Sequence, residues 1–210
     1  MARGTLRVGA LAGVDVHLHW TLPLGVLFFT GFRWDPLGWV CMVALILAHE
    51  LGHALAVKAV GARPLRIEVS GFGGLCFWQG DVTPVGRAVI AWGGPGAQLL
   101  LLLLAWAGVA ALGMPREPTA WVVVSMLLGA NTWMMLFNLV PIAPLDGAEA
   151  WRLPVLLGRA ARRRLRSAPV VSAEAQAAQL DAAFDAGKRS DEVKSLVSDL
   201  LADARKGEDR

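Results

Sequence analysis

The chain has 210 residues, of which 55% are apolar and 18% are charged, and its formal net charge is +3. With a mean hydropathy of +0.50, it is too apolar for an ordinary soluble domain, so we expect a polytopic membrane protein. Its two cysteines, Cys41 and Cys76, fall in different segments, which argues against a disulfide framework and a cysteine-rich metal site.

The first apolar run extends from Leu18 to Phe32 and is shorter than the roughly 20 residues that a spanning helix needs. We expect a membrane helix here because His17, His19 and Trp20 can extend it into the headgroup region. His17 and His19 would face different sides of a helix, so we interpret them as interfacial or structural histidines rather than as groups near a metal.

The second run, Leu37 to Val57, has a spanning length and contains the pattern H-E-x-x-H at His49, Glu50 and His53. Histidines four apart lie on one helical face. They can share one Zn²⁺, and the intervening glutamate can act as the base toward a water on the metal. The alternative, two ordinary buried polar residues, is disfavoured by the cost of placing such groups in an apolar span.

The segment Leu65 to Val82 is too polar and too rich in glycine to span a membrane, and Ile67 and Val69 alternate with polar neighbours. This alternation predicts a strand or a hairpin. Gly71, Gly73 and Gly74 permit close backbone approach. We weigh a plain connecting loop against a strand edge that pairs with an extended peptide beside the metal site.

Two further spans follow, Ala88 to Met114 and Ala120 to Val140. Pro95 should bend the first of them near its start, and we interpret Gln98 as a partner in a hydrogen bond between helices. The second carries Asn131 and Asn138 and ends at Pro141.

Beyond Trp151 the composition becomes basic and then polar. The arginine cluster predicts contact with anionic headgroups on the cytoplasmic side, and a nucleic-acid partner is disfavoured because no binding motif accompanies it. Pro169 separates the cluster from a tail in which Ser172 and Ser190 can cap two helices, so we expect a helical hairpin that offers a surface to a regulatory partner. The cluster consists of Arg159, Arg162, Arg163, Arg164 and Arg166, and the apolar tail positions are Ala175, Ala178, Leu180, Phe184, Val193, Leu196, Val197 and Leu200.

The expected fold class is an all-α polytopic membrane protein with about four transmembrane helices. A short glycine-rich strand or hairpin lies between the second and third helices, and a small helical cytoplasmic tail follows the last. We expect residues 1–150 to form the membrane-embedded core, residues 151–168 a basic juxtamembrane segment and residues 169–210 the tail.

The distribution of Lys and Arg predicts the orientation. With a cytoplasmic N-terminus, the cytoplasmic segments hold most of the basic residues, and the two outer loops hold only Arg33 and Arg116. The positive-inside rule therefore places both termini in the cytoplasm. The second helix then ends, and the fourth helix returns, at the cytoplasmic face, which brings Asp146 to the depth of the histidines.

Asp146 is the expected third metal ligand, because catalytic zinc needs three protein ligands and H-E-x-x-H supplies two. Pro141 and Pro144 disfavour continued helix, and Gly147 allows a turn that can direct one carboxylate inward. Glu149 is the rival ligand, and helix capping by Asp146 is the structural alternative.

The combination of H-E-x-x-H in one membrane helix with N-x-x-P-x-x-P-L-D-G at Asn138 to Gly147 resembles the site-2 protease family of intramembrane zinc metalloproteases. The similarity covers about Val16 to Gly147 and includes Gly94-Pro95-Gly96-Ala97-Gln98, which is similar to the family's G-P-x-x-N element. The chain departs from the family at Gln98, where Asn is usual, and at Ala148, where a second Gly is common.

The resemblance implies a role for each matching residue. His49, His53 and Asp146 would bind zinc, and Glu50 would be the catalytic acid and base. Asn138, Gln98 and the glycine-rich segment with Gly71, Gly73 and Gly74 would contact the substrate.

These assignments predict a mechanism. A transmembrane peptide bond is shielded by its own helix, so the substrate must unwind before water can attack it. Strand pairing at Ile67 to Gly71 would hold the substrate open, while Glu50 moves the proton to the leaving amine. Asn138 or Asn131 is the candidate donor to the oxyanion, and packing between helices is the equal alternative for both.

We therefore expect an intramembrane zinc endopeptidase that acts in the lipid bilayer on a single-span membrane protein. The alternatives are a metal transporter, in which His and Glu would be transit ligands, and a catalytically silent relative that acts as a scaffold. Only four expected spans and no His-rich loop argue against the transporter, and the intact Glu50 argues against the scaffold.

Overall fold

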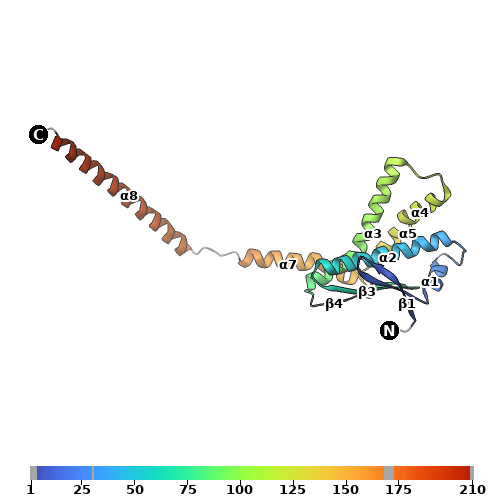
Figure 1. The fold of residues 1–210 in the computed structure, drawn as a ribbon. Coiled ribbons are helices and arrows are strands. Elements are labelled where there is room, and N and C mark those ends of the chain that lie inside the picture. The colour runs from blue at the N-terminus through green and yellow to red at the C-terminus, as the bar shows by residue number, and fades with distance from the viewer. Residues whose placement is uncertain (1–3, 30, 168–172, 209–210) are drawn as a thin grey trace. The chain divides into compact units, whose positions relative to one another are not determined.

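The structure is a computed structural model that describes residues 4–29, 31–167 and 173–208 (Figure 1). The chain divides into two compact units, residues 1–160 and 161–210. The first unit contains a four-stranded sheet and the apolar helices, and it holds all the candidate site residues. The second unit consists of the end of one helix and a further long helix.

The sheet combines two strands from the start of the chain with two that follow the second helix. The strands are β1 Thr5–Leu11, β2 Val14–His19, β3 Arg63–Ser70 and β4 Gly73–Gln79, in the order β1-β2-β3-β4. β2 and β3 are parallel, and the other two pairs are antiparallel. Val14, Ile67 and Val69 on one face are buried in a core with Ile46 and Ala54 of the second helix.

The helices are α1 Leu22–Phe29, α2 Pro36–Ala59, α3 Pro84–Leu112, α4 Pro118–Leu128, α5 Ala130–Asn138, α6 Gly147–Ala150, α7 Arg152–Ser167 and α8 Ala173–Glu208. The long apolar helices begin with a capping side chain followed by proline, which satisfies a free backbone N–H and presets the first turn. These pairs are Asp35 and Pro36, Thr83 and Pro84, and Glu117 and Pro118.

Three segments of the described chain are long and apolar enough to cross a membrane: Pro36–Ala59, Pro84–Leu112 and Pro118–Asn138. They coincide with three predicted spans. The third comprises α4 and α5, which meet at Gly129. Large apolar side chains on α3, among them Leu100, Leu104 and Trp106, are more than half exposed, as expected for a surface that faces lipid.

The predicted span from Leu18 to Phe32 is not confirmed. Leu18 and His19 belong to β2, and α1 has 8 residues, a length of about 12 Å against a hydrocarbon core of about 30 Å. The assignment of His17 and His19 to different helix faces is wrong, because residues two apart in a strand share a face. Both histidines lie away from the metal donors, as the structural interpretation predicted: His17 pairs with Glu68 across the sheet, and His19 Nδ1 contacts Thr21 Oγ1 at 2.8 Å.

The predicted strand or hairpin in Leu65 to Val82 is confirmed by β3 and β4. The strands β1 and β2 were not predicted, although Val14, Val16 and Leu18 alternate with polar residues, a pattern typical of a strand with one buried face.

The tail differs from the predicted hairpin. α8 is one continuous helix of 36 residues, and Ser190 lies in its interior. Pro169 and Ser172 lie outside the described residues. Also outside the described part of the chain are the side chains of Arg164, Arg166, Ala175, Leu180 and Leu200.

Candidate metal centre

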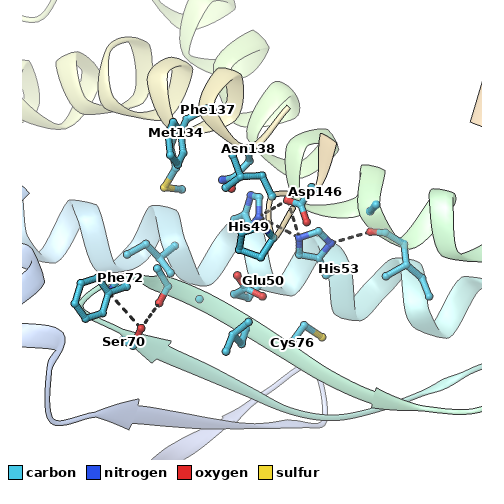
Figure 2. Close-up of a pocket in the computed structure, with 18 of the residues that line it drawn as sticks. His49, Glu50, His53, Ser70, Phe72, Cys76, Met134, Phe137, Asn138 and Asp146 are labelled. Atoms are coloured by element: carbon cyan, nitrogen blue, oxygen red, sulfur yellow. Dashed lines mark hydrogen bonds and ion pairs between the residues drawn. The ribbon is translucent and has the colours of Figure 1, made fainter. Parts of the chain in front are cut away.

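Three titratable side chains from one turn of α2 are buried in the centre of the first unit. His49, Glu50 and His53 have 5%, 3% and 7% of their surface exposed. α2 holds them between the sheet on one side and α3 on the other. Figure 2 shows the two imidazoles directed toward Asp146 and Glu50 directed toward β4.

The donor atoms of His49, His53 and Asp146 converge. The two Nε2 atoms are 3.0 Å apart, and Asp146 Oδ2 is 3.0 Å from His49 Nε2 and 3.3 Å from His53 Nε2. Within the described part of the chain, these three residues form the group of His, Cys, Asp and Glu side chains that could hold a metal ion. Asp146, predicted from the topology, therefore lies beside the histidines.

The Nδ1 atoms establish which nitrogen faces this centre. Ile90 O lies 2.7 Å from His53 Nδ1, and Gln98 Oε1 lies 3.0 Å from His49 Nδ1. Because carbonyl oxygens accept hydrogen bonds, these contacts favour a proton on Nδ1 and a lone pair on Nε2, although Gly94 N also lies 3.3 Å from His53 Nδ1. Such partners orient histidine ligands in metal sites.

This donor set fits zinc. Donors about 2.0–2.1 Å from a tetrahedral zinc ion lie about 3.3 Å from one another, close to the separations given above. Asp146 Oδ2 is buried and has no hydrogen-bond donor among the described residues. Three lone-pair atoms this close repel one another unless a cation or a proton lies between them.

Gly94 keeps the space beside the two imidazoles open. A Cβ atom at this position would lie 2.5 Å from both His49 Nε2 and His53 Nε2, so the volume in front of the nitrogens exists because residue 94 has no side chain. The sequence pattern at Gly93-Gly94-Pro95 indicated only helix packing and a bend.

Hydrogen bonds around α6 hold the loop that carries Asp146. Trp151 Nε1 donates to Leu139 O at 2.7 Å, and Trp92 Nε1 of α3 donates to Ala150 O at 2.9 Å. The two indole rings meet edge to face with centroids 5.5 Å apart. The loop is thereby attached to α3 and to the end of α5.

Glu149, the rival ligand, contacts Arg152 instead. Its Oε1 accepts a hydrogen bond from Arg152 Nη1 at 2.8 Å, and it is not in the metal-donor group. Asp146 is the N-cap residue of α6, but its side chain makes no capping hydrogen bond. Both observations favour Asp146 as a ligand over its alternatives.

A cavity of about 900 Å³ adjoins the donors. The polar groups in its wall include Glu50, Asp146 and Asn138, and Gly71, Gly73 and Gly74 line the side formed by the β3–β4 hairpin. Its apolar walls include Ile46, Phe72, Trp133, Met134 and Phe137. Its size and lining suit an apolar chain that must be held next to a few polar groups.

The two asparagines have different environments. Asn131 is fully buried, and its Nδ2 donates to Gln98 O of α3 at 2.9 Å, which is the packing role between helices. Asn138 lines the cavity (Figure 2). Asn138 is therefore the better candidate for a donor to substrate.

Gln98 does not line the cavity. It is fully buried, and its side chain contacts His49, so its position favours orientation of a ligand over the predicted substrate contact. The interaction between helices expected of Gln98 is present, with a metal-site histidine as its partner.

The strand edge that is free to pair with a substrate also differs from the predicted one. Ile67 is paired with Val16 of β2 on one side and with Cys76 of β4 on the other, and the same double pairing extends to Val69, so Ile67 to Val69 have no free edge. β4 is the outer strand, and Gly74 packs directly against the Glu50 carboxylate. The free edge next to the site belongs to β4.

Cys76 lines the same cavity but is not a fourth donor. Burial, together with the charge of Glu50, raises the pKa of its thiol to about 12. The thiol is also not among the converging donor atoms.

Comparison with known proteins agrees with this geometry. Residues 23–145 match the family described as Peptidase M50B-like. The chain is 30% identical over 170 residues to Rip3 of Mycobacterium tuberculosis (strain H37Rv), which is named as a zinc metalloprotease; the match covers 71% of this chain and 43% of Rip3. It is 31% identical over 165 residues to sll0528 of Synechocystis, also named as a zinc metalloprotease, covering 69% of this chain and 42% of that protein.

The chain thus spans less than half the length of these relatives. The solved site-2 protease from Methanocaldococcus jannaschii superposes with a TM-score of 0.55 at 19% identity, over 72% of this chain and 71% of the other. At that level of identity, the similarity supports a shared fold and no more. Because the family match covers more than half of the chain, and relatives and fold agree with it, the chain belongs to the Peptidase M50B-like family, the site-2 proteases.

Proposed function

We propose that this protein is an intramembrane zinc endopeptidase that hydrolyses a peptide bond in or near the transmembrane segment of a single-span membrane protein. The observation that carries the proposal is the convergence of His49 Nε2, His53 Nε2 and Asp146 Oδ2. This group adjoins a largely apolar cavity that also contains Glu50.

His49, His53 and Asp146 would hold the zinc ion, with Gln98 and the Ile90 carbonyl orienting the two imidazoles. When bound, zinc supplies a Lewis acid that makes water a nucleophile near neutral pH. Glu50 would accept the proton of the attacking water and deliver it to the leaving amine. Because Glu50 is almost fully buried, the transfer would take place away from bulk solvent.

The free edge of β4 is the proposed substrate guide. A helical substrate segment must unwind before its peptide bond can be attacked, and its freed N–H and C=O groups then need partners. An outer strand offers such partners by strand addition. Gly74 near the start of β4 brings the backbone next to Glu50, and Asn138 would bind the substrate carbonyl on the opposite wall.

Both termini are proposed to be cytoplasmic, as the Lys and Arg distribution indicates. This orientation requires the chain before α2 to cross the membrane through β2 and α1, whose separate lengths add up to about 30 Å. Lys58 Nζ contacts Ala12 O, which places the β1–β2 turn at the C-terminal end of α2. β2 is paired on both sides, so its backbone tolerates membrane depth.

The replacement Glu50→Gln tests the proposal. It should retain zinc and fold but cleave a single-span substrate at least about 100-fold more slowly, because an amide cannot accept the proton. The measurement is cleavage by detergent-purified protein alongside its zinc content. Glu68→Gln, on β3 and outside the cavity wall, is the matched control. Cleavage by Glu50→Gln at the wild-type rate would falsify the assigned mechanism.

A further inference from the structure

α7 combines a basic face with an apolar face. It contains six arginines and no acidic residue. At 3.6 residues per turn, Arg152, Arg159 and Arg163 fall within an arc of about 40°, and the apolar residues Ala160, Leu153 and Leu157 follow at about 80–140° from Arg152.

The described side chains of α7 are largely open. Val155 and Leu157 are 54% and 53% exposed, and Arg159 and Arg162 are exposed as well. A suitable occupant accepts apolar side chains and carries negative charge beside the exposed Arg159 and Arg162. The surface of an anionic lipid leaflet does both, since a basic amphipathic helix lies in the interface with its apolar face among the acyl chains.

The start of α7 is connected to the metal centre by a short segment that hydrogen bonds and an ion pair fix in place. Only α6 and Trp151 separate Asp146 from Arg152. Trp151 donates to Leu139 O, Ala150 O accepts from Trp92, and Arg152 pairs with Glu149. With so few residues and these hydrogen bonds, a displacement of the first turn of α7 is transmitted to the Asp146 loop.

We infer that α7 binds the headgroups of anionic phospholipids in the plane of the membrane, and that this binding holds Asp146 at the metal centre. Anionic lipid then strengthens metal retention, and through it the cleavage rate. The statements about metal retention and cleavage rest on the proposed zinc ligands and the proposed function, whereas lipid binding does not.

The test uses the full chain in nanodiscs of phosphatidylcholine alone or with about one third phosphatidylglycerol. Chymotrypsin reports on α7, because it cuts after Leu156 and Leu157, and mass spectrometry identifies the bonds. Zinc retained during dialysis against a chelator reports on the metal centre. Cleavage of a single-span substrate is the third measurement.

In anionic nanodiscs we expect proteolysis at these leucines to be at least about tenfold slower and zinc loss to be severalfold slower than in neutral ones. The triple variant Arg159→Gln, Arg162→Gln, Arg163→Gln should lose most of both differences. The matched control Lys188→Gln, Arg189→Gln, Lys194→Gln removes the same charge from exposed positions of α8 and should retain them.

Each other result has a definite meaning. Equal proteolysis in the two lipids, whether fast or slow, overturns lipid binding; slow cutting in both would indicate a protein occupant. Lipid-dependent proteolysis with unchanged zinc retention overturns the coupling to Asp146. A control variant that behaves like the α7 variant reduces the effect to net charge and also overturns the inference. Lipid-dependent zinc retention in a protein that cleaves no substrate supports the inference and contradicts the proposed function.

Discussion

At the residue scale, the orientation of the metal-centre donor atoms depends on the side chains and carbonyl groups next to them. His49 and His53 present bare Nε2 atoms when their protons are on Nδ1, and Gln98 and the Ile90 carbonyl favour that tautomer. Pro95, in the turn after Ile90, interrupts the hydrogen-bond pattern of α3. Gln98, the residue at which the chain departs from the G-P-x-x-N pattern, reaches the His49 imidazole.

Asp146→Asn should lower zinc affinity by more than the 10- to 100-fold typical of losing an outer hydrogen-bond partner, because a neutral amide replaces the only anionic donor. Glu149→Gln should change zinc affinity little, since Glu149 contacts Arg152. The measurement is zinc stoichiometry after dialysis against a mild chelator, with folding followed by thermal unfolding. Zinc loss from Glu149→Gln alone would reverse the ligand assignment.

Gly94→Ala should abolish zinc binding while leaving α3 helical, because the new methyl group would occupy the space in front of both Nε2 atoms. Gly96→Ala is the matched control, since a Cβ atom at Gly96 meets nothing within 4 Å. Zinc content and circular dichroism of the two purified variants distinguish the cases. Equal zinc content in both would show that the metal lies elsewhere.

At the scale of elements, the site depends on how closely α2, α3 and β4 approach one another. Gly52 and Gly93 bring the backbones of α2 and α3 into direct contact, and Gly74 brings β4 against Glu50. Small residues permit such close packing in lipid, where the hydrophobic effect does not drive helices together. The position of Glu50 between an outer strand and the donors follows from these contacts.

Gly93→Ala should destabilise the fold by about 1–3 kcal/mol, the usual cost of overpacking, because its Cβ atom would lie 2.6 Å from Gly52 O and 2.9 Å from Ala56 Cβ. Gly108→Ala, on the same helix with nothing within 4 Å of its Cβ, should be neutral or stabilising. Thermal unfolding in detergent measures both. A Gly93→Ala protein as stable as Gly108→Ala would contradict the close helix crossing.

At the scale of the whole molecule, the direction of the strands relative to the spans bears on the proposed orientation. Gly71 N donates to Thr21 Oγ1 at 3.1 Å, so the tip of the β3–β4 hairpin lies where β2 leads into α1. β2 and β3 both run in the direction opposite to α2. In the proposed orientation, the hairpin tip with its exposed Phe72 points from the cytoplasmic face into the bilayer.

A reporter fused after Arg210 should be active in the cytoplasm, and Arg116→Cys, between α3 and α4, should react with a membrane-impermeant maleimide added from outside intact cells. Both results follow from the Lys and Arg asymmetry and from an odd number of crossings between the two points. The native Cys41 and Cys76 are replaced by Ala, and labelling of lysed cells serves as the control. Labelling of residue 116 only after lysis would overturn the orientation.

Local sequence determined the spans at Leu37, Ala88 and Ala120 and the paired histidines, because hydropathy and helical spacing act within one segment. Placing Asp146 with them required only the direction of each span, which the basic residues supply. The N-terminal strands show the same alternation as β3, but the run from Leu18 to Phe32 was apolar enough to suggest a helix.

Tertiary structure alone decided the remaining assignments. A strand becomes an edge or a central strand according to its neighbours, and β3 is central only because the distant β2 pairs with it in parallel. The separate roles of Asn131, Asn138 and Gln98 likewise depend on which helix each one faces. These contacts join residues 33 to 51 positions apart, beyond the reach of any local periodicity, so the folded chain determines them.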